Sequence, residues 1–332
     1  MEGLIAVTYK CNAKCCMCNT WQYPTKDEEE ITAADLSKIP ANLKFANITG
    51  GEPFLRKDIE ELVNVVKKKA ERLVISTNGY FTERITEVAR KNRDIGIRIS
   101  IEGLPSANDE LRGIRDGFDH GLRTLLRLHE LGLKDIGFGI TLSDRNGKDI
   151  NELYSLAEWL GVEFATAAVH NTYYFHKYDN EITRKEAVSG ELYTLIDRML
   201  KSSQPKKWFR AYFNYGLINY IQGNPRLLPC NMGTDLFFLD PFGEIRPCNG
   251  MEASMGNIRR STFEEIWNSD RAAEVREAVG KCGKNCWMIG SAAPAMKKEI
   301  LVPARWILRH KFLKKPVRPM EDTGTADKAG VI

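Results

Sequence analysis

The arrangement of eight cysteines limits what this chain can fold into more than any other feature of its 332 residues. Four cysteines lie near the N-terminus, four lie past residue 225, and none stands between the two groups. No apolar run reaches the roughly 18 residues of a membrane span, and the N-terminus lacks the marks of a secretory signal. We therefore expect a cytosolic protein, in which grouped cysteines bind metal rather than form disulfides. The two groups predict two metal sites on two separate structural units.

Short β-rich runs alternate with helical stretches from Leu4 to about His170. Amphipathic patterns between the runs, such as Ile59-Leu62-Val63-Val66 and Leu122-Leu125-Leu126-Leu128, have the spacing of one helix face. Six such units in a row predict an α/β fold, a partial (β/α)6 barrel of the TIM type with its helices outside. The expected strands are Leu4–Thr8, Phe45–Thr49, Leu73–Ser76, Ile97–Glu102, Ile136–Thr141 and Glu163–Val169.

Three thiolates follow the first expected strand within eight residues, in the pattern Cys11-x3-Cys15-x2-Cys18. Thiolate is the ligand type for zinc and for iron–sulfur clusters. Structural zinc takes four closed ligands, and the adjacent Cys15 and Cys16 would fit poorly in one tetrahedral site. A cubane held by three cysteines instead keeps one iron free for a ligand. Zinc remains the alternative on spacing alone.

The run Cys11-Asn12-Ala13-Lys14-Cys15-Cys16-Met17-Cys18 resembles the cluster-binding loop of the radical S-adenosylmethionine (SAM) superfamily, with Met17 as its hydrophobic residue. The resemblance implies that Cys11, Cys15 and Cys18 hold a [4Fe–4S] cluster whose open iron binds SAM. It also implies cleavage of SAM to methionine and a 5′-deoxyadenosyl radical, which takes hydrogen from a substrate.

The motif Gly50-Gly51-Glu52-Pro53 directly follows the second expected strand. Its two glycines allow a close approach of the backbone to a ligand, and Glu52 offers an acceptor for an ammonium group. In the family this motif meets the amino end of SAM. The alternative is an ordinary turn with proline at the start of a helix.

On the fourth expected strand, Ser100 and Glu102 share a polar face, because they alternate with isoleucines. A polar face within a buried parallel strand is unusual and suggests contact with a hydroxyl-rich ligand. The family usually has Asp where Glu102 stands, serving the SAM ribose. Further matches to the family's SAM-binding pattern lie after the third and fifth strands, at Ser76, Asn78 and Thr141.

The second cysteine group has the pattern Cys230-x12-Gly243-x4-Cys248, followed by Cys282-x3-Cys286. It resembles the opening of the SPASM and twitch domains, which carry auxiliary iron–sulfur clusters. A full SPASM array has seven cysteines, and four remain here, as in the shorter twitch version. Four thiolates can close one [4Fe–4S] cluster, which favours electron transfer; a closed zinc site is the alternative.

The region around the second group has further predicted features. A hairpin is expected at Leu236–Ile245, turning on Pro241-Phe242-Gly243. The last dozen residues are expected to be disordered. The predicted parts are a radical SAM barrel (1–181), a helical linker (182–225), a twitch- or SPASM-like domain (226–290) and a basic amphipathic segment with a disordered tail (291–332).

Two residues near the expected barrel mouth have open roles. Cys16 could donate hydrogen to a substrate radical, or be a small buried residue of the cluster loop. His170, followed by Tyr173, Tyr174 and His176, is a candidate catalytic base. The alternative is a loop whose aromatic residues pack against the linker helices.

The segment Lys297–Lys315 mixes basic and apolar residues. It could lie on an anionic membrane surface, as a peripheral contact. A stretch of this kind is more often a solvated amphipathic helix packed on its own domain, and Pro303 interrupts it.

The sequence therefore predicts a radical SAM oxidoreductase that oxidises a small hydroxylated molecule, a sugar or an aminocyclitol, with a second [4Fe–4S] cluster as electron acceptor. A peptide or protein maturase of the same superfamily is the alternative, and a zinc-stabilised binding module is a third class. A flavodoxin- or ferredoxin-type protein is the expected electron donor. A net charge of +4 is too small to indicate a nucleic-acid partner.

Overall fold

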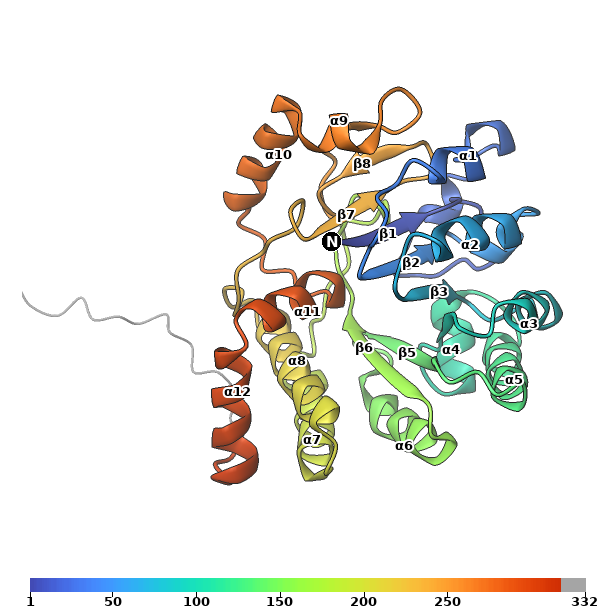
Figure 1. Cartoon of the computed structure of the whole chain (residues 1–332). Coiled ribbons are helices and arrows are strands. Elements are labelled where there is room, and N and C mark those ends of the chain that lie inside the picture. The colour runs from blue at the N-terminus through green and yellow to red at the C-terminus, as the bar shows by residue number, and fades with distance from the viewer. Residues whose placement is uncertain (318–332) are drawn as a thin grey trace, which may run out of the picture.

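The computed structural model describes residues 1–317 and shows a sheet of nine strands with helices packed along its outer side (Figure 1). Six parallel strands lie in the spatial order β6-β5-β4-β3-β2-β1, so each neighbours the next one in the chain. The predicted α/β partial barrel is confirmed, and each strand end lies within two residues of its expected position. The strands are β1 Glu2–Ala6, β2 Phe45–Thr49, β3 Leu73–Thr77, β4 Gly96–Ser100, β5 Ile136–Leu142 and β6 Glu163–Ala168.

Helices fill the crossovers between the parallel strands and pack their apolar faces on the sheet. In α2 the predicted face of Ile59, Leu62, Val63 and Val66 is buried, whereas Leu126 of α5 is exposed. The helices of the barrel are α1 Ala33–Leu36, α2 Ile59–Lys67, α3 Thr82–Lys91, α4 Pro105–Arg112, α5 Gly117–Glu130 and α6 Ile150–Leu160. Short 3-10 turns lie at Thr20–Gln22, Asp27–Glu29, Pro53–Leu55 and Gly147–Asp149.

The region of the second cysteine group continues the sheet of the barrel. Strand β7 (Leu236–Leu239) pairs in parallel with β1, on the side away from β2, and pairs antiparallel with β8 (Glu244–Arg246). The predicted hairpin is confirmed, with Gly243 at φ 90° in its turn, and β9 (Gly256–Asn257) extends it. Strand β7 covers the edge of β1 that would otherwise be unpaired, so one sheet runs through the regions of both cysteine groups.

Two long helices and a set of short ones complete the chain. The predicted helical linker contains α7 (Lys185–Lys201) and α8 (Pro205–Ile221). The helices that follow are α9 Phe263–Trp267, α10 Asp270–Gly280, α11 Ile289–Lys298 and α12 Leu301–Ile307, with a π-helical turn at Leu308–Phe312. Within residues 1–317 no helix combines the length and the apolar character that crossing a membrane requires. The predicted disorder of the last dozen residues falls outside the described residues.

Candidate functional site

Cys11, Cys15 and Cys18 follow the carboxyl end of β1 and line a cavity of about 280 Å³. Residues at the carboxyl ends of the other five barrel strands complete its wall, which is where a parallel barrel places its functional groups. The other predicted site residues that line the cavity are Met17, Gly50, Gly51, Ser76, Asn78, Ser100, Glu102, Thr141 and His170. Sequence reasoning missed several further lining residues, among them Trp21, Arg112, Phe175 and Asn249.

Gly50 and Gly51 bring the turn after β2 against the backbone that leads into the cysteine loop. A Cβ atom on Gly51 would lie 2.2 Å from the carbonyl oxygen of Lys10, and one on Gly50 would lie 2.5 Å from that of Thr8. Both atoms belong to backbone, which cannot move aside as a flexible side chain would. The two glycines therefore set the close spacing between this turn and Cys11.

The cysteine loop is fixed on the last turn of α4. The backbone N–H of Lys14 donates to the carbonyl oxygen of Arg112 at 3.0 Å, and that of Cys16 donates to Leu111 at 2.9 Å. These carbonyls belong to the helix end, where they have no partner within the helix. The loop and the helix end thus satisfy each other. Cys16 is exposed and does not line the cavity.

Burial makes the three thiols of this loop reluctant to ionise. It raises the pKa of Cys11 to about 12 and that of Cys15 to about 11, and it also raises the pKa of Cys18. The guanidinium of Arg112 opposes each of these shifts. Thiols of this kind ionise when a metal replaces their protons. The three thiols form no disulfide and lie on one cavity wall, which fits the ligand set of an iron–sulfur cluster.

Glu52 and Pro53 do not line the cavity, unlike the other predicted residues. The Glu52 carboxylate is fully buried and accepts hydrogen bonds from Thr77 Oγ1 at 2.8 Å, Asn78 N at 2.7 Å and Phe54 N at 3.1 Å. Both of its oxygens are therefore used inside the protein. These bonds fix the end of β3, and the contact of Glu52 with SAM stays a prediction.

A buried ion pair joins Glu102 to Arg112 on the cavity wall. Arg112 Nη1 lies 3.1 Å from Glu102 Oε1, and the backbone N–H of Thr141 donates to Oε2 at 2.5 Å. Burial raises the pKa of Glu102, and the guanidinium opposes that rise. Arg112 Nε is buried and has no hydrogen-bond partner within the described residues. This guanidinium therefore has a donor left for an anionic group in the cavity.

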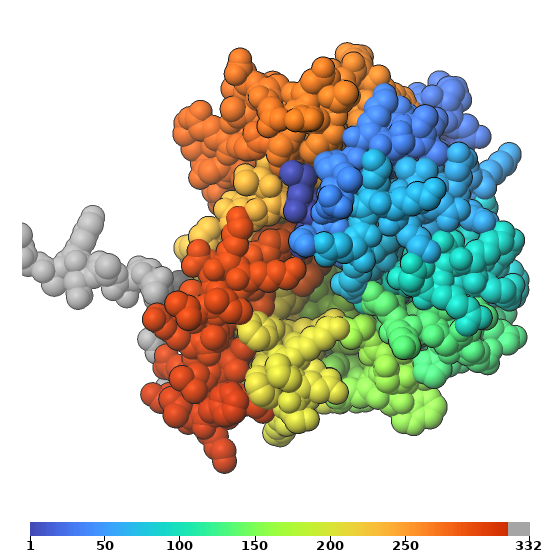
Figure 2. Space-filling model, in the orientation of Figure 1, coloured from blue at the N-terminus to red at the C-terminus, as the bar shows by residue number. Residues whose placement is uncertain are grey.

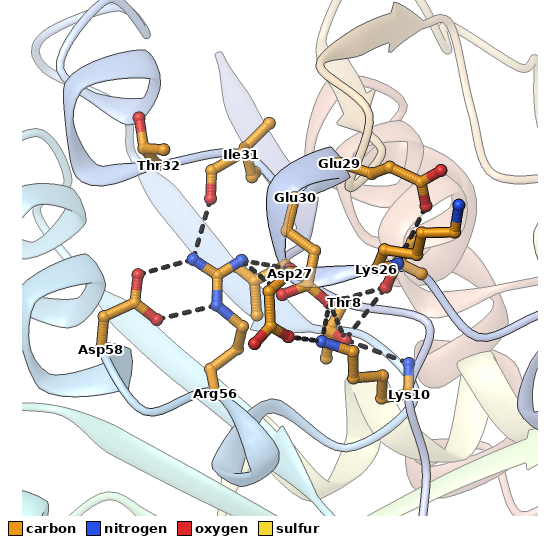
Figure 3. A network of polar contacts seen from close by, with 12 residues as sticks. Thr8, Lys10, Lys26, Asp27, Glu29, Glu30, Ile31, Thr32, Arg56 and Asp58 are labelled. Atoms are coloured by element: carbon orange, nitrogen blue, oxygen red, sulfur yellow. Dashed lines mark hydrogen bonds and ion pairs between the residues drawn. The ribbon is translucent and has the colours of Figure 1, made fainter.

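A second charged network lies just after β1 and connects three segments of the chain (Figure 3). Glu30, 3% exposed, accepts hydrogen bonds from Thr8 Oγ1 at 2.5 Å and from Thr25 Oγ1 at 2.6 Å. Arg56 lies 3.1 Å from Glu30 and donates to the carbonyl oxygen of Val7 at 2.9 Å. This network therefore fixes the end of β1, from which the cysteines emerge.

His170 has both ring nitrogens engaged by the protein. Nδ1 lies 2.6 Å from the carbonyl oxygen of Ala168, and Nε2 accepts the backbone N–H of Trp287 at 3.1 Å. The ring stacks on Tyr220 at 4.1 Å, and burial lowers its pKa to about 4. No nitrogen is left to act as a base, so the structure does not support the candidate catalytic role. His170 instead ties the end of β6 to the residue after Cys286.

The four cysteines of the second group lie near one another. Cys230 and Cys286 each raise the pKa of Cys248, which burial brings to about 11, and Cys282 acts in the same way on Cys286. Within residues 1–317 no three histidine, cysteine or acidic side chains gather closely enough to hold a single metal ion. Asn249, next to Cys248, lines the cavity of the first group. Asn249 therefore connects the segment of Cys248 to the wall of the first site.

Two family profiles match this chain. The profile of the radical SAM superfamily matches residues 5–157, and that of the SPASM iron–sulfur cluster-binding domain matches residues 230–287. The chain belongs to the radical SAM superfamily. The radical SAM domain implies a SAM-binding [4Fe–4S] cluster, and the SPASM domain implies an auxiliary iron–sulfur centre. The predicted cofactors are confirmed, and iron–sulfur clusters replace zinc as the assignment for both sites.

Similar proteins include enzymes of tetrapyrrole synthesis. The chain is 33% identical over 160 residues to Fe-coproporphyrin III synthase of Methanosarcina barkeri. This match covers 46% of this chain and 39% of that protein. It is 25% identical over 313 residues to AdoMet-dependent heme synthase of Nitratidesulfovibrio vulgaris, covering 83% of this chain and 82% of that protein.

Among solved structures, this radical SAM fold matches Streptococcus suis SuiB bound to S-adenosylmethionine, with a TM-score of 0.65 and 17% identity. The match covers 84% of this chain and 67% of that one, and it supports the fold.

We expect Arg112→Gln to weaken SAM binding by about 10- to 100-fold, since a hydrogen bond to a charged group contributes about 1.5–3 kcal/mol. The reason is that Arg112 is the one lysine or arginine among the described residues that line the cavity, and its buried Nε has a hydrogen left to donate to a carboxylate. Equilibrium dialysis of iron-loaded protein against labelled SAM measures the change. Arg145→Gln, which removes an exposed cation paired with Glu110, is the matched control. Unchanged SAM affinity in a fully iron-loaded Arg112→Gln protein contradicts the assignment.

Proposed function

We propose that this radical SAM enzyme oxidises a small hydroxylated molecule, such as a sugar or an aminocyclitol, with loss of two electrons and two protons. When bound, the SAM cluster supplies a radical that removes hydrogen from carbon, and the auxiliary cluster supplies an acceptor for the second electron. The chain binds and orients these groups and shields the cavity from water.

The position of Asn249 carries this proposal. It follows Cys248 of the second group, and it lines the same cavity as Cys11 of the first group. Its carbonyl oxygen accepts the backbone N–H of Tyr174 at 3.0 Å, and the Tyr174 hydroxyl donates to the carbonyl oxygen of Gly50 at 2.6 Å. The auxiliary segment is thereby joined to the SAM-site turn through one residue. This closeness supports the passage of an electron from a substrate radical to the second cluster.

The lining of the cavity supports a substrate that carries oxygen acceptors. Trp21 lines it, and the indole N–H is buried without a partner in the described residues. An unpaired buried donor favours a ligand with oxygen acceptors. Two relatives are named as a heme synthase and a coproporphyrin synthase. A tetrapyrrole is therefore the competing substrate class in the test of this proposal.

The cytosolic location and the electron donor belong to the same proposal. All eight cysteines are free of disulfides, which suits a reducing compartment. A flavodoxin- or ferredoxin-type protein would supply the electron that starts each turnover.

Anaerobic incubation of the iron-loaded enzyme with SAM and reductant tests the proposal, using separate panels of polyols and aminocyclitols, tetrapyrroles, and peptides. We expect a polyol or aminocyclitol to lose two hydrogens with one 5′-deoxyadenosine formed per product. Carbon-deuterated substrate should transfer deuterium to 5′-deoxyadenosine, and a reaction without SAM is the control. Turnover confined to tetrapyrroles, or confined to peptides, contradicts the proposed substrate class while leaving the radical SAM chemistry intact.

A further inference from the structure

The segment that follows α11 exposes an unusual number of large apolar side chains. Residues 1–317 expose thirteen large hydrophobic side chains, and six of these lie between positions 300 and 313. The six are Ile300, Leu301, Val302, Leu308, Phe312 and Leu313. Scattered exposed apolar residues are normal, but a concentration of this kind marks an interaction surface.

One face of this segment already packs on the protein. Pro303 and Ile307 are buried, and the Trp306 ring lies 5.2 Å from that of Tyr215 in α8. Lys311 Nζ donates to the carbonyl oxygen of Leu200 at 2.6 Å, at the end of α7. Pro303 does not break the segment, because it lies in the first turn of α12, where a helix needs no N–H from it. The inner face therefore accounts for the packing of this segment on the rest of the protein.

The opposite face carries a second apolar stripe. Leu301 and Leu308 are seven residues apart, which is two helical turns, and Phe312 follows one turn later. They are 65%, 53% and 56% exposed. In Figure 2 the helices of this segment, drawn in red, form a protruding edge of the molecule. The Phe312 ring also contacts α8, 5.5 Å from the ring of Trp208, yet more than half of each of the three side chains stays exposed. A surface helix normally turns polar residues outward, so the fold of the chain alone does not explain this exposure.

Basic residues surround the stripe. Arg305, Arg309, Lys314 and Lys315 make no ion pair within the described residues, and no acidic residue lies between positions 300 and 317. A row of free cations beside exposed Leu and Phe is the pattern of a helix that lies in a lipid interface. An acidic protein partner would explain the cations but not the outward apolar stripe along the same edge.

We propose that residues 300–315 seat this protein on the surface of an anionic lipid bilayer. The stripe of Leu301, Leu308 and Phe312 enters the headgroup boundary, and the neighbouring arginines and lysines contact the lipid phosphates. The contact is peripheral and independent of the proposed reaction.

Cosedimentation of the iron-loaded enzyme with vesicles tests this proposal. We expect binding to vesicles of phosphatidylcholine with 30% phosphatidylglycerol, at least about tenfold stronger than to phosphatidylcholine alone, and weakened by salt. The variant L301S/L308S/F312S should bind at least about tenfold more weakly, because buried apolar area sets interfacial affinity. The variant R305Q/R309Q/K314Q/K315Q should lose the preference for anionic lipid.

Two controls distinguish binding through this surface from nonspecific binding of exposed apolar side chains and from binding through the residues after position 317. L126S/W159S removes exposed apolar side chains from α5 and α6 and should bind like the parent chain. A chain ending at residue 317 should also bind normally. Equal vesicle binding by the stripe variant and the parent overturns the proposal. The proposal is also overturned if the parent chain does not bind anionic vesicles but forms a dimer that the stripe variant cannot form. The stripe would then bind a second copy of this chain.

Discussion

Replacing Arg56 with methionine is expected to lower the free energy of unfolding by about 3–5 kcal/mol, the cost of removing one partner from a buried ion pair. Arg56 lies 3.1 Å from Glu30, and their side chains are 8% and 2% exposed. Glu30 also accepts hydrogen bonds from Thr8 and Thr25, which hold it in place. Lys10, at 3.4 Å, is a weaker substitute because it is partly exposed. With methionine at position 56, the buried negative charge of Glu30 therefore lacks its main cationic partner.

Thermal unfolding of the iron-loaded protein under anaerobic conditions measures this effect. We expect a fall in Tm on the order of 5–8 °C for a chain of this length. The double variant R56M/E30Q should recover most of the loss, because it removes both charges. The control K91M breaks an exposed pair with Glu60, which should cost below about 1 kcal/mol. A single variant R56M as stable as K91M shows that the network in Figure 3 does not hold the cysteine loop.

Much of the barrel can be predicted from sequence because its signals are local. A buried parallel strand needs a short apolar run, and an outer helix such as α2 needs apolar residues three and four apart. Both patterns can be recognised in the sequence without knowledge of the tertiary contacts of their residues. The strand-end motifs follow from topology, since a parallel sheet collects the carboxyl ends of its strands at one edge. Gly50 follows one predicted strand and Ser100 lies two residues from the end of another, so their positions in the chain suffice to place them at the same cavity.

Other parts of the site depend on contacts that no local pattern encodes. Arg112 ends a helix with no motif around it, and only the folding of α4 under the cysteine loop brings it to the cavity. Asn249 reaches the cavity because β7 pairs with β1, a contact between residues more than 200 positions apart. The sequence suggests a base at His170 because it does not reveal that the distant Trp287 backbone occupies Nε2. The sequence likewise does not reveal that Glu52 accepts hydrogen bonds from the end of β3.

Cys15→Ala and Cys16→Ala are expected to give opposite results although the two residues are neighbours. Cys15 lines the cavity, whereas Cys16 is exposed and its backbone is fixed on the end of α4. Cys15→Ala should lower the iron content from about eight to about four atoms per chain and abolish 5′-deoxyadenosine formation. Cys16→Ala should change neither. Iron analysis and chromatography of 5′-deoxyadenosine measure both, and loss of iron in Cys16→Ala with retention in Cys15→Ala reverses the assignment of ligands.

Cys248→Ala extends this comparison to the second site. It should also lower iron to about four atoms per chain, but SAM cleavage should continue while substrate oxidation stops, because only the acceptor of the second electron is lost. Deuterium from labelled substrate should still reach 5′-deoxyadenosine. If SAM cleavage stops instead, with the first cluster intact by its spectrum, electrons enter through the second cluster rather than leave through it. The closeness of Asn249 to Cys11 would then serve reduction of the SAM site, and the proposed oxidation would lose its acceptor.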